Sequence, residues 1–305
     1  MKKMLFVYNP RSGKGSIRNS LATIIEIFTA AGYEVTVHPT NREKDARNTV
    51  QLRAHEFEMI VCSGGDGTLD EVVAGLMDSG MKRTIGYIPA GSTNDFGNSL
   101  GIPKNMEAAA QLVTTGEPFF CDSGRMNDEY FVYVAAFGAF TDVSYQTNQD
   151  LKNMLGHAAY LLEGMKRMGT WKSRWMRVES EEFCDEGEFV FGMITNSNSV
   201  GGIKGLPGVD IELNDGLFEV VLVRPPQNLG DWQDIIAAVL TQESTRNVVR
   251  FKTRSLKLYS DEPVAWTRDG ENGGEHTKVE LVNLQQVLHI IVDMGAEPVL
   301  HELEA

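Results

Sequence analysis

Residues 61–71 read V-C-S-G-G-D-G-T-L-D-E, and they place three glycines and an aspartate between an apolar run and a helical pattern. Glycine has no Cβ and tolerates a positive φ, so a ligand can lie directly against the backbone of residues 64–67. The helix expected to begin near Thr68 points its partly positive amino end into the same space, which suits phosphate. A bare carboxylate repels phosphate, so we expect Asp66 to act through a divalent cation or a bridging water. The alternative is a tight strand-to-helix turn with Asp66 exposed.

The first 120 residues alternate between short apolar runs and helical patterns. The runs that are typical of strands occupy residues 4–8, 33–38, 58–62 and 84–88. The helical patterns occupy residues 16–31, 43–55 and 68–78, and the last has on one face Leu69, Val72, Val73, Leu76 and Met77. Strands alternating with helices predict an α/β domain, a parallel sheet with flanking helices, over residues 1–124.

After about residue 124 the pattern changes to short runs rich in β-branched and aromatic residues, with turn residues between them. This pattern predicts a mainly antiparallel β-sandwich, or a barrel, over residues 125–294. One candidate helix, residues 151–168, interrupts it. A return of the C-terminal residues 295–305 to the first domain is left open. We expect the chemistry in the cleft between the two domains.

The composition limits the class of protein. The chain has 305 residues, of which 42% are hydrophobic and 23% charged, as in ordinary globular proteins. Its formal net charge of −14 repels the phosphates of DNA and RNA, so no nucleic-acid partner is expected. Three isolated cysteines indicate a reducing cytosol. Because no apolar stretch approaches roughly 18 residues and the apolar N-terminal run is too short for a signal peptide, we expect a cytoplasmic protein.

Two more loops follow strands at the same edge of the predicted sheet. The loop N-P-R-S-G-K-G, residues 9–15, follows the first strand, and P-A-G-S-T-N-D-F, residues 89–96, follows the fourth. Neither common nucleotide motif fits. A Walker loop needs glycine where this chain has Tyr8 and serine or threonine where it has Gly15. The dinucleotide fingerprint that starts at Gly65 needs glycine where the chain has Asp70. The predicted phosphate site is therefore of another kind.

These three loops, together with a late D-G-E at residues 269–271, resemble in order and spacing the diacylglycerol kinase catalytic domain, and above all the soluble bacterial lipid kinases of that family. The resemblance spans nearly the whole chain. G-G-D-G alone is shared with NAD kinases and phosphofructokinases, whereas its combination with G-S-T-N-D-F and D-G-E is more selective. The resemblance implies a fold like that of NAD kinases and diacylglycerol kinases, with ATP and Mg²⁺ as cofactors.

The resemblance also implies which residues hold ATP. Those carried over are Asn9, Pro10, Arg11, Ser12, Gly13, Lys14, Thr40, Gly64, Gly65, Asp66, Gly67, Thr68, Leu69, Asp70, Thr93, Asn94 and Asp95. Asp66 would also serve the magnesium ion of the active site. Lys14 is a candidate cation for the phosphates, or equally a solvated lysine in a loop.

For catalysis the resemblance implies that Glu271 is the general base that accepts the proton of the lipid hydroxyl, with Asp269 nearby. A positioned carboxylate of this kind typically contributes about 10²–10⁴-fold, and positioning and charge neutralisation supply most of the rest. From the residues alone, D-G-E-N-G-G also fits a simple hairpin turn between strands 263–267 and 277–282. The resemblance further implies a structural magnesium loop at 211–218, held by the Asp215 carboxylate and the backbone carbonyls of Glu212 and Leu217.

Two positions depart from the family pattern. Asp70 stands where the family usually has asparagine, and Gly97-Asn98 stands where it usually has Ala-Arg. We expect Asp70 to add negative charge near the phosphate loop, which requires an extra cation or an outward rotamer. The missing arginine removes a candidate partner for phosphate.

A lipid kinase must reach a membrane, although this chain is strongly acidic. Residues 151–178 hold six basic residues and one acidic residue, and they include Trp171 and Trp175, which suit an interface. This basic island predicts transient peripheral contact with the inner membrane surface. A helix packed on the sandwich with a solvated basic edge is the alternative.

The favoured prediction is an ATP-dependent kinase that phosphorylates a diacylglycerol-type lipid in phospholipid metabolism. The alternatives are an NAD kinase, against which the G-S-T-N-D-F segment argues, and a catalytically silent nucleotide-binding regulator, suggested by Asp70 and Asn98. The choice among lipid alcohols is left open. A homodimer through an exposed strand edge is also left open.

Overall fold

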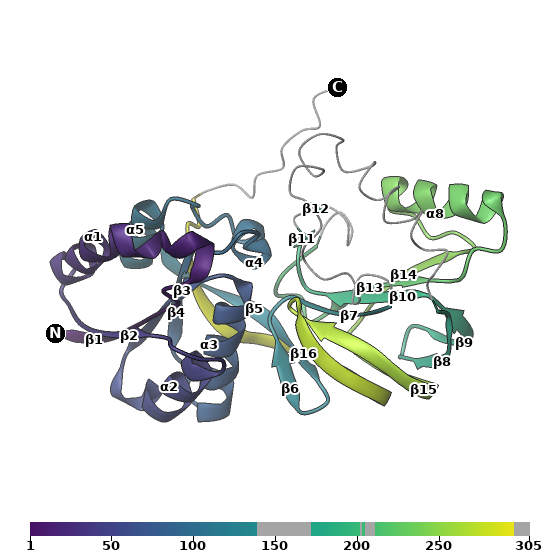
Figure 1. Cartoon of the computed structure of the whole chain (residues 1–305), viewed down its shortest axis with the longest axis horizontal. Coiled ribbons are helices and arrows are strands. Elements are labelled where there is room, and N and C mark those ends of the chain that lie inside the picture. The colour runs from purple at the N-terminus through teal and green to yellow at the C-terminus, as the bar shows by residue number, and fades with distance from the viewer. Residues whose placement is uncertain (139–171, 202, 205–210, 296–305) are drawn as a thin grey trace, which may run out of the picture.

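The computed structural model describes residues 1–138, 172–201, 203–204 and 211–295, and it has two lobes (Figure 1). The candidate helix at 151–168 and nearly all of the tail 295–305 lie outside the described residues. Within the described chain, no helix is long and apolar enough to cross a membrane.

The first lobe is the predicted α/β layer. Its four parallel strands lie in the order β4-β3-β1-β2, with bounds β1 Lys2–Tyr8, β2 Tyr33–Pro39, β3 Met59–Gly64 and β4 Thr84–Pro89. Helices α1 (Ile17–Ala30) and α5 (Met106–Thr115) cover one face of the sheet, and α2 (Asp45–Arg53) and α3 (Asp66–Ser79) cover the other (Figure 1). Short helical turns are η1 (Ser12–Gly15), η2 (Ala54–Glu56) and α4 (Asp95–Ser99). The predicted strands and helices of this lobe are confirmed.

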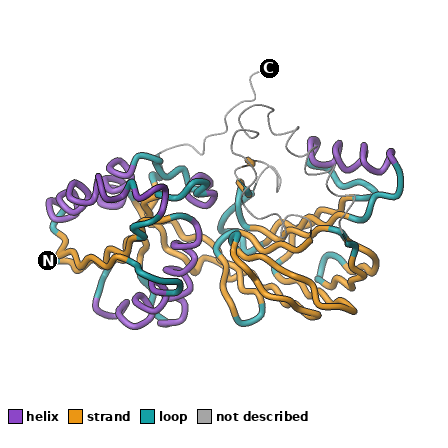
Figure 2. Tube along the Cα trace, viewed as in Figure 1, coloured by secondary structure: helices purple, strands orange, loops and turns teal. Residues whose placement is uncertain are grey.

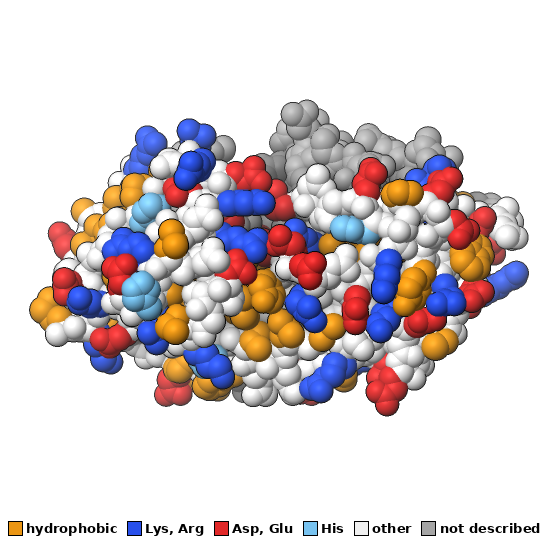
Figure 3. Space-filling model, turned by 90° about the horizontal axis from the view of Figure 1, so that it is seen from below, with side chains coloured by type: hydrophobic (Ala, Val, Ile, Leu, Met, Phe, Trp, Pro, Cys, Tyr) orange, Lys and Arg blue, Asp and Glu red, His pale blue; other side chains and the backbone are white. Residues whose placement is uncertain are grey.

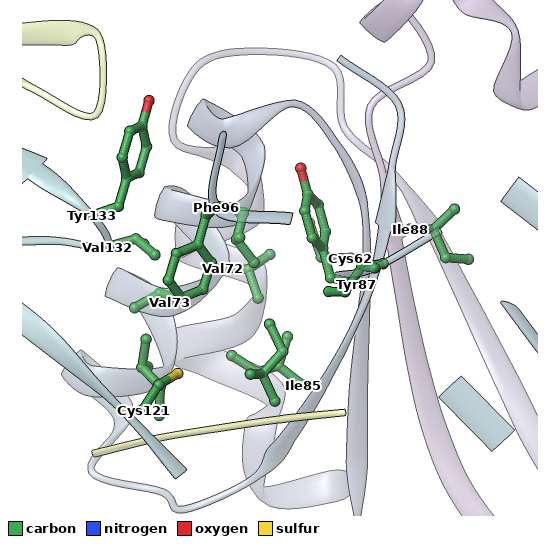
Figure 4. Close-up of a cluster of buried hydrophobic side chains, with 14 of the residues drawn as sticks. Cys62, Val72, Val73, Ile85, Tyr87, Ile88, Phe96, Cys121, Val132 and Tyr133 are labelled. Carbon is green, nitrogen blue, oxygen red and sulfur yellow. The ribbon is translucent and has the colours of Figure 1, made fainter. Parts of the chain in front are cut away.

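Burial of apolar side chains places α3 on the sheet. Every residue of β3 is buried, as expected for a strand covered on both faces. Val72 and Val73 of α3 are buried next to Ile85 of β4 (Figure 4). The same core contains Val132 and Tyr133, which come from the chain that enters the second lobe. The first lobe therefore holds this connecting segment by packing.

The second lobe is mainly antiparallel, as predicted. Its strands are β6 Glu129–Phe131, β7 Val134–Gly138, β8 Arg174–Glu179, β9 Cys184–Phe189, β10 Phe191–Thr195, β11 Ser199–Val200, β12 Ile203–Lys204, β13 Phe218–Val223, β14 Val248–Thr253 and β15 Ser255–Arg268. A separate core forms around the large buried side chains Phe131, Phe137, Phe189, Phe218 and Trp266. Helix α8 (Leu229–Thr241) was not expected from the sequence. Its N-cap is Asn228, whose side chain accepts a hydrogen bond from Asp231 N.

Two long strands join the lobes. These are β5 (Glu117–Met126) and β16 (Glu271–Val292), which pair with each other along much of their length (Figure 2). At its start β16 pairs with β15 of the second lobe, and at its end it runs parallel to β4 of the first, with His289 beside Thr84. The described strands therefore form one sheet of 14 strands that continues through both lobes, besides the small β11–β12 ribbon. The division at residue 124 stays a prediction.

Candidate active site

The three glycine-containing loops at the carboxyl ends of β1, β3 and β4 lie against one another. A methyl group built on Gly91 would lie 2.6 Å from the Cα of Gly65, so the second and third loops touch through bare backbone. Gly13, with φ +53°, approaches the carbonyl oxygen of Ala90 so closely that a Cβ would overlap it. Only glycine allows these contacts, which explains the glycines of the sequence motifs. The structure thus brings the predicted phosphate loops to one edge of the sheet.

The first loop is tied to the second by hydrogen bonds of Asn9. Its backbone N–H donates to Ser63 O at 2.8 Å, and its Nδ2 donates to Thr68 Oγ1 at 3.4 Å. Thr68 lies in the first turn of α3, and a Cβ on Gly64 would overlap its side chain. This packing leaves the amino end of α3 beside the 9–15 loop, where a phosphate group can meet backbone N–H groups.

Asn94 closes the third loop on itself. With φ 52°, its Oδ1 accepts from Gly91 N at 2.9 Å and its Nδ2 donates to Gly91 O at 2.9 Å. Asn98, at the position where the family pattern has arginine, donates its Nδ2 to Thr93 O at 2.9 Å. Asn98 therefore stabilises the 89–96 loop through a hydrogen bond to its backbone and supplies no charge.

Several other residues carried over as nucleotide ligands have different surroundings. Thr40 follows β2, and its N–H donates to Tyr8 O at 2.9 Å, so it lies next to the end of β1. Leu69 is fully buried in the core, and its N–H donates to Gly65 O at 3.2 Å. Pro10, Arg11 and Ser12 lie on the first loop, where the Arg11 N–H donates to Asn9 Oδ1 at 2.9 Å. The Lys14 side chain lies outside the described part of the chain.

Asp66 is the first residue of α3, and its two carboxylate oxygens differ. Oδ2 accepts from Asp95 N at 3.1 Å, whereas the buried Oδ1 has no hydrogen-bond partner among the described residues. Burial, together with the charges of Asp95 and Asp269, raises the pKa of Asp66 to about 6, although backbone hydrogen bonds from Asp95 and Phe96 act in the opposite direction. Asp95 in turn accepts from Ser199 Oγ of the second lobe at 2.6 Å, a contact that no motif in the sequence indicates.

This environment fits a divalent cation. A buried carboxylate oxygen without a donor, close to other carboxylates, is an unfavourable arrangement that a positive ion would relieve. In the described residues, no group of three or more His, Cys, Asp and Glu side chains is arranged as a metal site. Asp66 would therefore supply one ligand, and phosphate oxygens and water the others, as magnesium prefers.

Glu271 comes to this site from the second lobe. A methyl group built on Gly67, at the start of α3, would lie 3.0 Å from Glu271 Oε1. Glu271 is the first residue of β16, it pairs with Arg268 across the turn, and its side chain is exposed. The hairpin expected from D-G-E-N-G-G is present, and it brings a carboxylate onto the predicted phosphate loop. The sequence shows the hairpin, but only the fold shows what it faces.

Asp269, two residues earlier, is buried, and its carboxylate binds the backbone of residues 132–134. Its Oδ2 accepts from Val132 N at 2.5 Å, and its Oδ1 accepts from Tyr133 N at 3.0 Å and Val134 N at 2.9 Å. Only 5% of Asp269 is exposed. The structure thus places Asp269 near Glu271 but engages its carboxylate with the backbone.

Of the two ways in which Asp70 was expected to be accommodated, an extra cation or an outward rotamer, the structure does not show the outward rotamer. The Asp70 side chain points inward and shares a hydrogen bond with Asp269. Burial and the neighbouring Asp269 raise the pKa of Asp70 well above its usual value, although Arg268 and Arg47 act in the opposite direction. Burial and Asp269 therefore favour the uncharged form of Asp70, and its effect on nucleotide binding stays a prediction.

The predicted structural magnesium loop has its own partners. Asp215 Oδ1 accepts from Leu217 N at 2.9 Å, and Asp215 Oδ2 lies 3.7 Å from the ammonium group of Lys252. The Leu217 carbonyl accepts from Asn283 Nδ2 at 3.0 Å, and the Glu212 side chain is exposed. Because an ammonium group already faces Asp215, these residues fit a metal ion less well than the surroundings of Asp66 do.

The described part of the basic island is paired with acids. Lys172 Nζ and Arg174 Nη1 lie 3.1 Å and 3.3 Å from Glu262 Oε2, and Arg177 Nε lies 2.9 Å from Glu179 Oε1. Figure 3 shows acidic and basic side chains interspersed on this lobe. Trp175 is 44% exposed. The rest of the island, residues 151–171, lies outside the described residues, so membrane contact stays a prediction.

The chain is similar to known proteins over almost its whole length. The model of the diacylglycerol kinase catalytic domain matches residues 3–126. A diacylglycerol kinase of Bacillus subtilis is 34% identical over 296 residues, covering 96% of this chain and 97% of its own. The diacylglycerol kinase of Staphylococcus carnosus is 31% identical and covers 95% and 94%. A crystal structure of a putative diacylglycerol kinase from Bacillus anthracis has the same fold, with a TM-score of 0.82 at 24% identity, covering 97% of each chain.

The fold, the loops and these relatives define a phosphotransferase that acts on an alcohol acceptor. The chain belongs to the diacylglycerol kinase family.

Proposed function

We propose that this protein transfers the γ-phosphate of ATP to the hydroxyl of a diacylglycerol-type lipid and so produces phosphatidic acid. Family membership supports the reaction class. The observation that carries the proposal is the Glu271 carboxylate beside Gly67, because it joins a proton acceptor of one lobe to the phosphate loop of the other.

The described residues suggest which groups bind the phosphates, accept the proton and hold the magnesium ion. Backbone N–H groups at the start of α3 and in the 9–15 and 89–96 loops bind the phosphates. Glu271 takes the proton of the lipid hydroxyl while the hydroxyl oxygen forms a bond to the γ-phosphorus. At the same time the bond between the γ-phosphorus and the bridging oxygen breaks, so ADP leaves. Asp66 would hold Mg²⁺ with its free oxygen, and the ion would supply positive charge to the phosphates.

A second magnesium ion at the 211–217 loop is retained as a proposal, in competition with Lys252. The ammonium group of Lys252 lies 3.7 Å from Asp215 and 3.2 Å from Glu219, so an ion bound there would displace it. No step of the reaction depends on this ion.

We further propose that the protein contacts the membrane surface only peripherally, through the basic island. Changing Lys166, Arg167, Lys172 and Arg174 to glutamine should weaken co-sedimentation with anionic vesicles. Unchanged co-sedimentation would show that the island is ordinary surface. A dimer formed through the exposed edge strand β2 or β14 also stays a proposal, and light scattering of the purified protein measures it.

The function is tested with purified full-length protein, radiolabelled ATP and Mg²⁺. Diacylglycerol in mixed micelles, a panel of other lipid alcohols and NAD serve as acceptors. We expect label in diacylglycerol or a close analogue, a loss of about 10²–10⁴-fold in kcat for Glu271→Gln, and a large loss for Asp66→Ala. Label in NAD alone, or full activity of Glu271→Gln, would refute the proposal.

A further inference from the structure

The turn that carries Glu271 is held by Asp269 in an uncommon backbone conformation. Asp269 and Gly270 have φ values of 47° and 84°, the left-handed conformation of a tight hairpin turn. Aspartate adopts this conformation more readily than most residues with a Cβ, but it still costs free energy, which the contacts of Asp269 offset. Here the N–H of Asp269 donates to Val134 O at 2.8 Å, and its carboxylate accepts three backbone N–H groups. The turn therefore depends on the contacts of Asp269.

These contacts determine which carboxyl group carries a proton. The three N–H donors on Asp269 favour its ionised form, which can accept about four hydrogen bonds and donates none. Asp70, whose buried Oδ1 has no other hydrogen-bond partner among the described residues, lies against Asp269 and supplies the remaining one. If Asp70 were ionised too, two buried acceptors would face each other without a hydrogen between them. The geometry is satisfied only when Asp70 is the donor.

We propose that Asp70 is a positioning residue, whose protonated carboxyl group donates a hydrogen bond to Asp269 and thereby holds the turn that presents Glu271 to Gly67. Asp70 lies one helical turn after Gly67 on α3, so the helix that forms the phosphate loop also holds the base that faces it. Burial, which raises the pKa of Asp70, agrees with this assignment. The inference rests on the proposed function, because it concerns the base of that reaction.

The charged groups around this pair leave the proton in place. Arg268 is the last residue of β15 and precedes Asp269 in the chain. Its Nη1–H donates to Tyr130 O at 2.9 Å, and Nη1 lies 3.8 Å from Glu129 Oε2. Arg47 of α2 contacts Asp78 of α3 and Glu129 of β6, each at 2.7 Å. Both arginines lower the pKa of Asp70, but these hydrogen bonds and ion pairs go to other acceptors, and the buried Nε of Arg268 has no hydrogen-bond partner among the described residues. Asp66, at the start of α3, adds negative charge, which opposes ionisation of the pair.

The test compares Asp70→Asn, which keeps a neutral donor of the same shape, with Asp70→Leu, which keeps the volume and removes the donor. We expect the asparagine variant to have at least ten times the kcat of the leucine variant, with KM for ATP within about twofold between the two. Ser79→Ala is the control on the same helix, since it removes only the local hydrogen bonds of Ser79 with Leu76 O and Met81 N and leaves Asp70, Asp269 and Arg47 alone. Its kcat should change by less than about twofold.

A second measurement does not depend on activity. Unfolding by denaturant at several pH values compares the wild type with Asp70→Asn. Below the unfolded pKa of Asp70 the folded and unfolded chains both hold its proton, whereas above that value only the folded chain keeps it. The unfolding equilibrium constant of the wild type, relative to the variant, should therefore rise up to tenfold per pH unit until the pH passes the pKa of Asp70 in the folded protein.

Equal kcat values for the asparagine and leucine variants would overturn the positioning role. Parallel pH–stability curves for the wild type and Asp70→Asn would overturn the shared proton, and so the proposal, even if the leucine variant does not fold. A wild type that transfers no phosphate to any lipid, yet shows the pH-dependent difference, would refute the proposed function and the positioning of a base for it, while leaving the Asp70–Asp269 contact established.

Discussion

A single methyl group at Gly67 should make the protein more stable and less active. Gly67 lies in the first turn of α3, and its φ is not in the left-handed region, so alanine fits the backbone there. Replacing glycine with alanine at such a position typically stabilises by about 0.4–1 kcal/mol, because the unfolded chain has fewer conformations. For a chain of this size, that corresponds to a rise in Tm of about 1–3 °C.

The same methyl group disturbs Glu271. It would lie 3.0 Å from Oε1, which is closer than ordinary contacts, so the carboxylate has to move by a few tenths of an ångström. The end of a flexible side chain moves at little cost in stability. A displacement of about 1 Å at a reacting group costs about 10²-fold in rate, so this smaller shift should lower kcat about tenfold.

The assay is a double-mutant cycle with Gly67→Ala and Glu271→Ala. Steady-state kinetics with ATP and mixed micelles of diacylglycerol give kcat for the wild type, the two single variants and the double variant, and thermal unfolding gives Tm. In the Glu271→Ala background the methyl group has no carboxylate to displace, so Gly67→Ala should change kcat less than about twofold. The coupling energy between the two sites would then be about 1.4 kcal/mol.

Two results would refute this reasoning. If Gly67→Ala lowered kcat equally in both backgrounds, its effect would not pass through Glu271. If it raised KM for ATP tenfold with kcat unchanged, the methyl group would be blocking the nucleotide instead of moving the base.

Three further predictions follow from the same region and its neighbours. Gly91→Ala places a methyl group 2.6 Å from Gly65 Cα, so it should destabilise the fold by about 1–3 kcal/mol, measured by denaturant unfolding, and raise KM for ATP. Because the pKa of Asp66 is raised to about 6, the protein without ligands should lose up to about 3 kcal/mol of stability as the pH rises from 4 through 6. Asp66→Asn should remove this loss, and an unchanged slope of unfolding free energy against pH in the variant would contradict the assignment. Lys252→Met should increase the rise in Tm produced by Mg²⁺, since it removes the ammonium group near Asp215, and the absence of any Mg²⁺ effect in this variant would count against the second ion.

The strands and helices of the first lobe could be predicted because their signals are local in the sequence. Each strand of β1 to β4 is a short run rich in apolar residues, and β1, β3 and β4 are followed by loops with glycine at positions where a Cβ would overlap a neighbour, as at Gly13 and Gly91. Amphipathic spacing gave α3 because its apolar face is the side that packs on the sheet. These signals lie within a few residues of one another, so no knowledge of the distant chain is needed.

What could not be read depends on residues far apart in the chain. The end of β16 pairs with β4, about 200 residues earlier, and an apolar run alone does not show which strand it will join. The pairing of Asp70 with Asp269 is of the same kind. An acidic residue in a phosphate loop suggests a charge, and only its buried partner shows that its pKa is raised. Ser199, which reaches Asp95 from the second lobe, has no local signal at all.

The irregular pairing of β5 with β16 has a mechanical consequence. Between Leu284 and Leu288 the register shifts, Gln286 has φ 54°, and its N–H donates to the buried Asp122 at 2.7 Å. On either side of this bulge, regular pairing stiffens the strands against bending. If the two lobes pivot during a catalytic cycle, we expect the β5–β16 connection to bend at this bulge, where the carboxylate of Asp122 holds the backbone of Gln286.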